Sequence, residues 1–106
     1  MAKLPNIHPS EVLSEEFLVP FGLSREHLAE EIGVPAEHIA EICSGQRAIA
    51  ADVALRLSRF FGTTAAFWLG LQADYDTEET ESTLRGTLNR IRRFDPGAVG
   101  ENKNCV

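Results

Sequence analysis

The most constraining feature of the chain is a pair of short amphipathic segments joined by one glycine, within residues 24–42. Each segment carries an apolar face at helical spacing, formed by Leu28, Ala29, Ile32, Ile39 and Ile42. Gly33 lies between the segments, where the chain must leave a helix through a left-handed conformation that disfavours a side chain. Ala29 is small enough to let a second helix cross the first closely. The pattern therefore predicts two short helices crossing at a tight turn.

This layout is that of a helix-turn-helix, in which the second helix commonly lies in the major groove of DNA. The alternative is an ordinary helical hairpin without a ligand. The turn chemistry favours the first interpretation, since Ser24 is a good N-cap and Pro35 suits the first position of a helix. We therefore take DNA binding as the leading hypothesis.

The remaining chain predicts an all-α fold. Apolar spacing and turn residues indicate five helices, with approximate ranges 9–18, 24–33, 35–44, 51–61 and 65–73. The run Pro20-Phe21-Gly22 is expected to stop the first helix. The expected buried stripe of the fourth helix consists of Val53, Ala54, Leu57 and Phe60. In the fifth helix, Phe67 is expected to lie mainly in the core.

The C-terminal part has a different composition. Residues 74–81 are acidic with few apolar side chains, and they either extend the fifth helix or form a linker. Leu84, Leu88 and Ile91 then recur at spacings of four and three, which predicts a short amphipathic sixth helix. The end of the chain is expected to be a flexible tail. These patterns predict a helix-turn-helix domain over residues 1–76, followed by an acidic linker, a short helix and the tail over residues 77–106.

Length and charge limit the possible functions. A chain of 106 residues with 43% hydrophobic residues suits one small domain with an extra element. No apolar run approaches the roughly 18–20 residues that span a bilayer, and no secretion signal is evident, so a soluble cytoplasmic protein is expected. The net charge is −6, which predicts weak non-specific affinity for DNA and suits a basic protein partner.

The sequence offers little support for an enzyme or a cofactor site. Cys43 and Cys105 show no metal-ligand spacing, and no common nucleophile or phosphate-loop motif is present. Adjacent carboxylates such as Glu15 and Glu16 point in different directions on a helix and indicate solvated faces. We expect no catalytic residues, no metal and no cofactor.

Three stretches resemble one known family. They are His8 to Ser24, with its His-Pro opening; Ile42 to Leu57, with Gly45 and Arg47; and Phe61 to Asp76, with its Phe-Trp-Leu-x-Leu-Gln segment. On these motifs the chain resembles the HigA antitoxins, also called virulence-associated protein I, among the Xre-type helix-turn-helix regulators. The resemblance covers about residues 7–76 and implies a five-helix, lambda-repressor-like domain with a C-terminal helical extension.

The resemblance also implies partners. HigA-type antitoxins are homodimers that bind a palindromic operator, repress their own operon and neutralise a small basic toxin of the HigB type that cleaves mRNA. Two alternatives are a stand-alone transcriptional regulator without a toxin and a protein-interaction module with weakened DNA binding. The acidic third helix keeps the second alternative open.

Helix-turn-helix geometry nominates the residues that meet DNA. The predicted DNA-binding set comprises Arg25, Ala36, Glu37, His38, Glu41, Ser44, Gln46 and Arg47. Arg25 and Arg47 are the leading candidates, as phosphate or groove-edge contacts. Many relatives carry basic residues where Ala36, Glu37 and His38 stand here, which puts operator recognition in question. The predicted dimer interface comprises Trp68, Leu71 and Tyr75, because large aromatics are enriched in interface cores.

Overall fold

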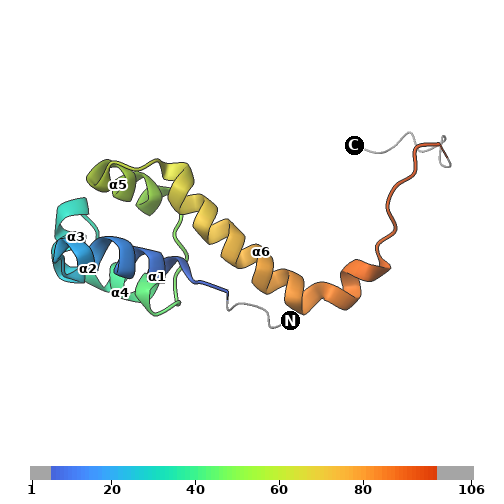
Figure 1. Ribbon diagram of the computed structural model, residues 1–106, viewed down its shortest axis with the longest axis horizontal. Helices are drawn as coiled ribbons and strands as arrows, with labels where there is room; N and C mark the ends of the chain where they lie inside the picture. The colour runs from blue at the N-terminus through green and yellow to red at the C-terminus, as the bar shows by residue number, and fades with distance from the viewer. Residues whose placement is uncertain (1–5, 98–106) are drawn as a thin grey trace.

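The structure, a computed structural model, describes residues 6–97 and is helical without strands over that range. Its elements are α1 (Pro9–Val12), the π-helical turn η1 (Leu13–Leu18), α2 (Val19–Phe21), α3 (Arg25–Ile32), α4 (Ala36–Cys43), α5 (Ala51–Phe61) and α6 (Ala65–Arg90). Since α1, η1 and α2 are continuous, residues 6–97 form five helices, and the all-α prediction is confirmed. Figure 1 shows α1 to α5 gathered in a body from which α6 projects. The predicted tail beyond residue 97 lies outside the described residues.

The first helix is longer than predicted. It continues through Pro20 and ends at Gly22, whose φ of 65° is left-handed. The helix widens before the proline, where the Val19 N–H donates to the Ser14 carbonyl, five residues back. Proline has no N–H and clashes with a regular α-helical ladder, and a π-helical turn provides a different spacing at that point. The predicted end at Leu18 was therefore three residues too early, whereas Gly22, one of the three residues expected to stop the helix, is its C-cap.

The core forms where α3, α4, α5 and the start of α6 meet the first helix. The buried hydrophobic residues are Leu13, Leu18, Leu28, Ala29, Ile32, Ile39, Ile42, Ile49, Val53, Ala54, Leu57 and Trp68. All five apolar residues of the predicted hairpin belong to this set, and Gly33 has a φ of 75°. The predicted crossing of two short helices at a left-handed glycine is confirmed.

Two aromatic predictions were wrong. Phe67, expected in the core, is 40% exposed, whereas its neighbour Trp68 is fully buried. Successive helical residues lie about 100° apart around the axis, so the inward direction of Trp68 turns the Phe67 side chain toward the edge of the core. The indole N–H of Trp68 donates to the Thr63 hydroxyl at 2.7 Å, which satisfies its polar atom inside the core. Phe60, expected in the buried stripe of α5, is 38% exposed.

The structure corrects the prediction of separate fifth and sixth helices, because α6 is a single helix of 26 residues. The acidic segment extends the fifth helix, and the predicted sixth helix is its continuation, because neither the carboxylates nor Gly86 breaks the ladder. Every described residue from Glu79 to Gly97 is exposed, so this part of α6 is not covered by the body. The predicted boundary near residue 76 therefore falls inside one continuous helix.

Candidate nucleic-acid interface

The candidate interface is built on the α3–α4 unit. Ser24 begins α3 by accepting a hydrogen bond from the His27 N–H at 3.0 Å. After the turn at Gly33, α4 begins at Ala36, with Pro35 one position earlier than predicted, as the N-cap. Ile39 and Ile42 face inward with no exposed surface. The opposite face of α4 is therefore open, and it is the face that a helix-turn-helix presents to a duplex.

The predicted contact residues of α4 share this outer face to different extents. Ala36 and Glu37 are exposed near the helix start, whereas His38 and Glu41 are partly buried. Ser44, the C-cap, is exposed, and its hydroxyl donates to the Glu41 carbonyl at 3.1 Å. The start of α4 thus offers one carboxylate and a small side chain, but no cation, to a groove.

Arg47 is the nearest cation that follows α4, and it is paired within the chain. The Nε and Nη2 atoms of its guanidinium each lie 2.8 Å from the same Glu41 carboxylate oxygen, Oε1. The backbone N–H groups of Gln46 and Arg47 both donate to the Glu41 carbonyl, at 2.8 and 3.2 Å. Two residues predicted to contact DNA therefore contact each other, and the sequence reasoning missed this pair.

The loop that carries Gln46 and Arg47 is anchored to α6. The buried Ile49 N–H donates to the Gln72 side-chain oxygen at 2.8 Å. The Gln72 amide nitrogen then donates to Asp76 at 3.0 Å, which fixes the orientation of the amide group. Gln72 is itself buried. Its role was not predicted, since no local pattern links positions 49 and 72.

A second fixed contact holds the turn between α3 and α4. Arg56 of α5 donates to the Ile32 carbonyl at 2.7 Å and, more weakly, to the Gly33 carbonyl at 3.3 Å. Its Nε pairs with Asp52 at 2.6 Å, one helical turn earlier. The i,i+4 spacing of Asp52 and Arg56 was the available sequence signal for this contact. Arg25, in contrast, lies exposed at the first position of α3.

The comparisons with known proteins agree with this geometry. The helix-turn-helix family matches residues 15–68, which is half of the chain. Virulence-associated protein I of Dichelobacter nodosus is 48% identical over 79 residues, covering 74% of this chain and 73% of that protein. Antitoxin HigA-1 of Vibrio cholerae is 35% identical over 72 residues, covering 68% of each chain.

The chain belongs to the HigA-type, Xre-like helix-turn-helix family. A solved structure titled Pseudomonas aeruginosa antitoxin HigA with higBA promoter superposes with a TM-score of 0.81 at 36% identity. The match covers 86% of this chain and all of that one. The predicted family and the lambda-repressor-like fold are therefore confirmed. The family is one of DNA-binding antitoxins and regulators.

The three predicted interface residues of this HigA-type chain have different environments. Trp68 is fully buried in its own core, so it has no surface left for a second copy, and that assignment is corrected. Leu71 and Tyr75 are partly buried. The Tyr75 ring packs edge-on against His8 with centroids 4.7 Å apart, and its carbonyl accepts from Asn6 at 3.0 Å. Part of the Tyr75 side chain is therefore occupied by the start of the same chain.

Other kinds of site find no support in the described residues. No group of three or more His, Cys, Asp or Glu side chains between residues 6 and 97 is placed to hold a metal ion. None of the helices in the same range is long and apolar enough to cross a bilayer. Cys43 is a partly buried free thiol in α4.

Proposed function

We propose that this chain is the antitoxin of a type II toxin–antitoxin pair. In this proposal it binds operator DNA as a homodimer, represses its own operon and neutralises a small mRNA-cleaving toxin in the cytoplasm. Residues 1–76 carry DNA binding, and residues 77–106 form an extension of that domain. No step of this function requires a catalytic residue or a cofactor.

The observation that carries DNA binding is the open outer face of α4 between two exposed arginines. Ile39 and Ile42 fix the inner face of α4 in the core, so Ala36 and Glu37 must face outward. Arg25 and Arg47 lie on the elements before and after this helix and supply the cations for phosphate contact. A relative titled as an antitoxin with promoter DNA shares this fold at a TM-score of 0.81.

Toxin binding is supported by the family and by charge. Two relatives are named antitoxins, at 35% and 36% identity. The whole chain has a net charge of −6, which favours association with a basic partner. This charge also limits background binding to DNA, so specific contacts must supply a large share of operator affinity.

Mobility-shift titration at low salt, with DNA from upstream of the gene, tests the DNA-binding half. Arg47→Ala is expected to weaken binding about 5-fold or more, because a lost guanidinium contact to a base costs about 1–3 kcal/mol. Arg59→Ala is the matched control, because Arg59 is an exposed arginine on α5 that does not belong to the predicted DNA-binding set. Equal affinity of Arg47→Ala and the parent would remove Arg47 from the interface.

Co-expression with the adjacent gene tests the antitoxin half. The expected outcome is that the neighbour arrests growth alone, that this chain restores growth, and that both proteins copurify. A neighbour without toxicity, together with intact operator binding, would instead assign the chain to stand-alone regulators.

A further inference from the structure

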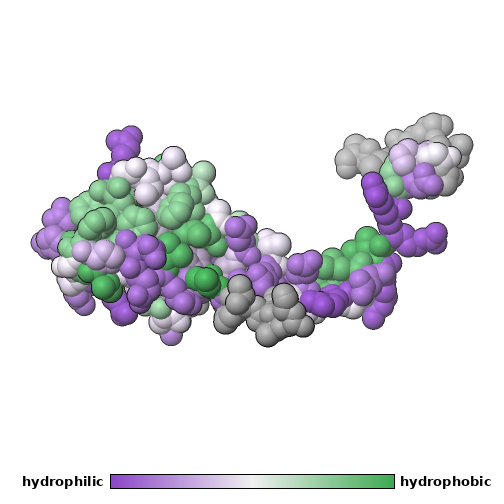
Figure 2. All heavy atoms as spheres, viewed as in Figure 1, coloured by the Kyte–Doolittle hydropathy of each residue, from purple (hydrophilic) through white to green (hydrophobic). Residues whose placement is uncertain are grey.

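The body carries a group of phenylalanine rings that extends from the core to the surface. These rings come from the first helix, α5 and α6, and we call them the aromatic patch: Phe17, Phe21, Phe60, Phe61 and Phe67. Phe21, Phe60 and Phe67 are 63%, 38% and 40% exposed, whereas the other two are partly buried against the core. Figure 2 shows hydrophobic surface gathered on the body toward the edge formed by α5.

The exposed rings belong to one continuous surface. The centroid of the Phe61 ring lies 6.3 Å from that of Phe21 and 5.0 Å from that of Phe60. The Phe17 ring lies 4.7 Å from Phe61 and 6.3 Å from Phe67, so it joins the two sides of the patch. Single exposed apolar residues are common on soluble proteins, whereas contiguous groups mark binding surfaces. The aromatic patch is of the second kind.

Contacts within the chain hold the patch in place. The buried Trp68 ring packs beneath it, 5.0 Å from both Phe17 and Phe67. Phe21 is the last residue of α2, and the turn after it is closed by the Leu23 N–H, which donates to the Leu18 carbonyl at 2.9 Å. A surface fixed before binding loses little conformational entropy, and aromatic anchors commonly supply most of the energy of an interface.

The charges around the patch indicate the kind of partner that fits it. The first helix carries three carboxylates and no lysine or arginine. Two of them, Glu15 and Glu16, are exposed on the helix that also carries two of the rings. On the α5 side the charges are mixed, because Arg59 and Glu31 line one pocket with Phe60. A complementary partner therefore presents an apolar side chain to the rings and cations to the first helix.

The patch lies away from the helix that faces DNA in the proposed function. Figure 1 shows α5 and the start of α6 along one edge of the body and α4 along the opposite edge. A partner on the aromatic patch therefore leaves the outer face of α4 open.

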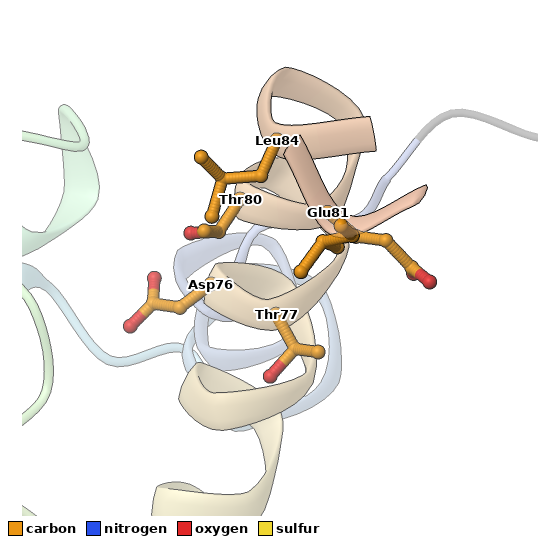
Figure 3. Close-up of a pocket in the computed structure, with 6 residues that line it drawn as sticks. Asp76, Thr77, Thr80, Glu81 and Leu84 are labelled. Carbon is orange, nitrogen blue, oxygen red and sulfur yellow. The ribbon is translucent and has the colours of Figure 1, made fainter. Parts of the chain in front are cut away.

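A groove on α6 is the other acidic surface that a basic partner can meet. It has a volume of about 440 Å³ and is lined by Asp76, Thr77, Thr80, Glu81, Leu84 and Leu88. Figure 3 shows these side chains on successive turns of the helix. All of them come from α6 alone, and none is aromatic. The aromatic patch is the better anchor, because it combines rings from three elements over a buried tryptophan.

We propose that the aromatic patch, together with Glu15 and Glu16, is the surface that binds the basic toxin of the proposed function. An apolar side chain of the toxin packs on Phe21 and Phe67, and lysine or arginine side chains beside it pair with the two carboxylates. The inference rests on the antitoxin function proposed above and names the surface that performs it. A toxin bound in this way leaves the chain able to bind its operator.

Biolayer interferometry between the full chain and the product of the adjacent gene tests this surface, with that product refolded after separation from the copurified complex. Phe21→Ala/Phe67→Ala should raise the dissociation constant at least about 30-fold, mainly through faster dissociation. Leu55→Ala is the matched control, because Leu55 is 56% exposed on α5 but lies about 140° around the helix axis from Phe60. Its affinity for the toxin should equal that of the parent.

A further variant separates lost docking from lost folding. Phe21→Asp changes a single side chain that is already 63% exposed, and it should still weaken toxin binding about 10-fold or more. The circular dichroism spectrum and the operator affinity of this variant should remain those of the parent, because the patch lies away from α4.

The contribution of charge is measured by the association rate. Glu16→Lys should slow association with the toxin about 5-fold and reduce its dependence on salt, as the reversal of a charge at the edge of an interface does. Glu30→Lys is the matched control, since it makes the same change at an exposed carboxylate of α3.

The outcomes distinguish this inference from the proposed function. If the parent does not bind the product of the adjacent gene, the antitoxin proposal and this surface both fail. If the parent binds and the phenylalanine variants bind equally well, the surface is wrong while the antitoxin function stands. Weakened binding by Glu81→Lys alone would place the toxin on the α6 groove and overturn the proposal in the same way.

Discussion

The α3–α4 end of the molecule and the distal half of α6 differ in how far their side chains are fixed by contacts within the chain. Around α4, Arg47 pairs with Glu41, and the Ile49 N–H donates to Gln72. Arg56 donates to backbone carbonyls at the turn and pairs with Asp52. Beyond Glu79, every described side chain is exposed. The first region is held in shape by contacts within the chain, whereas the second leaves apolar side chains uncovered.

This difference is consistent with the two kinds of partner in the proposed function. A preorganised α4 loses little conformational entropy on meeting a rigid duplex. An uncovered amphipathic helix can contribute affinity mainly by burying apolar area. The predictions below test this difference between the α3–α4 unit and the distal half of α6.

The largest expected effect comes from two adjacent aromatics at the start of α6. Trp68→Ala should lower the free energy of unfolding by about 3–5 kcal/mol, because it removes a fully buried side chain. Phe67→Ala should cost much less, since Phe67 is 40% exposed. Urea unfolding followed by circular dichroism measures both variants. Equal losses would show that the core boundary on α6 is misplaced.

The next effect concerns the loop after α4. Gln72→Met keeps the side-chain length but removes the oxygen that accepts from the buried Ile49 N–H. Leaving this donor unpaired should cost about 1–3 kcal/mol. Hydrogen exchange at the Ile49 amide should accelerate, and operator affinity should fall as the loop loosens. Ala48→Met is the control within the same loop, because Ala48 is exposed and lies outside the predicted DNA-binding set.

Local sequence patterns predicted the helix ends well where a cap sets them. Ser24 and Gly33 bound α3 as expected, and α5 has the predicted range of 51–61. The long α6 was not predicted as one helix, because composition alone does not decide whether an acidic segment continues a ladder. Gly86 lowers helix stability by about 1 kcal/mol without breaking the helix.

The candidate site was predicted less completely than the fold. The open face of α4 follows from periodicity, since Ile39 and Ile42 determine which side is buried. The Arg47–Glu41 pair was missed because it depends on the path of the loop after α4 rather than on a helical spacing. Gln72 was missed for a related reason: it meets a backbone N–H 23 residues away, which only tertiary packing can bring near.

Two glycines give opposite expectations in the two regions. Gly33→Ala should cost about 1–2 kcal/mol, because the residue has a φ of 75° and a Cβ would lie 3.2 Å from the Arg56 guanidinium. Gly86→Ala should stabilise α6 by up to about 1 kcal/mol, since no atom lies within 4 Å of the added Cβ. Thermal unfolding of both variants checks the signs. A destabilising Gly86→Ala would indicate that the distal helix has steric limits in the native assembly.

The smallest expected effect tests whether the ion pair with Glu41 competes with DNA for the Arg47 guanidinium. Glu41→Gln removes the charge that pairs with Arg47, and freeing this guanidinium should tighten operator binding. Because exposed ion pairs contribute about 0.2–1 kcal/mol, the gain should not exceed about 5-fold. Both side chains are partly exposed, at 38% for Glu41 and 47% for Arg47, so solvent already screens the pair.

The double variant Glu41→Gln/Arg47→Ala completes a thermodynamic cycle and should bind no better than Arg47→Ala. If Glu41→Gln instead weakens binding in both backgrounds, the Glu41 carboxylate itself contacts the duplex, as a carboxylate accepting from the cytosine amino group does.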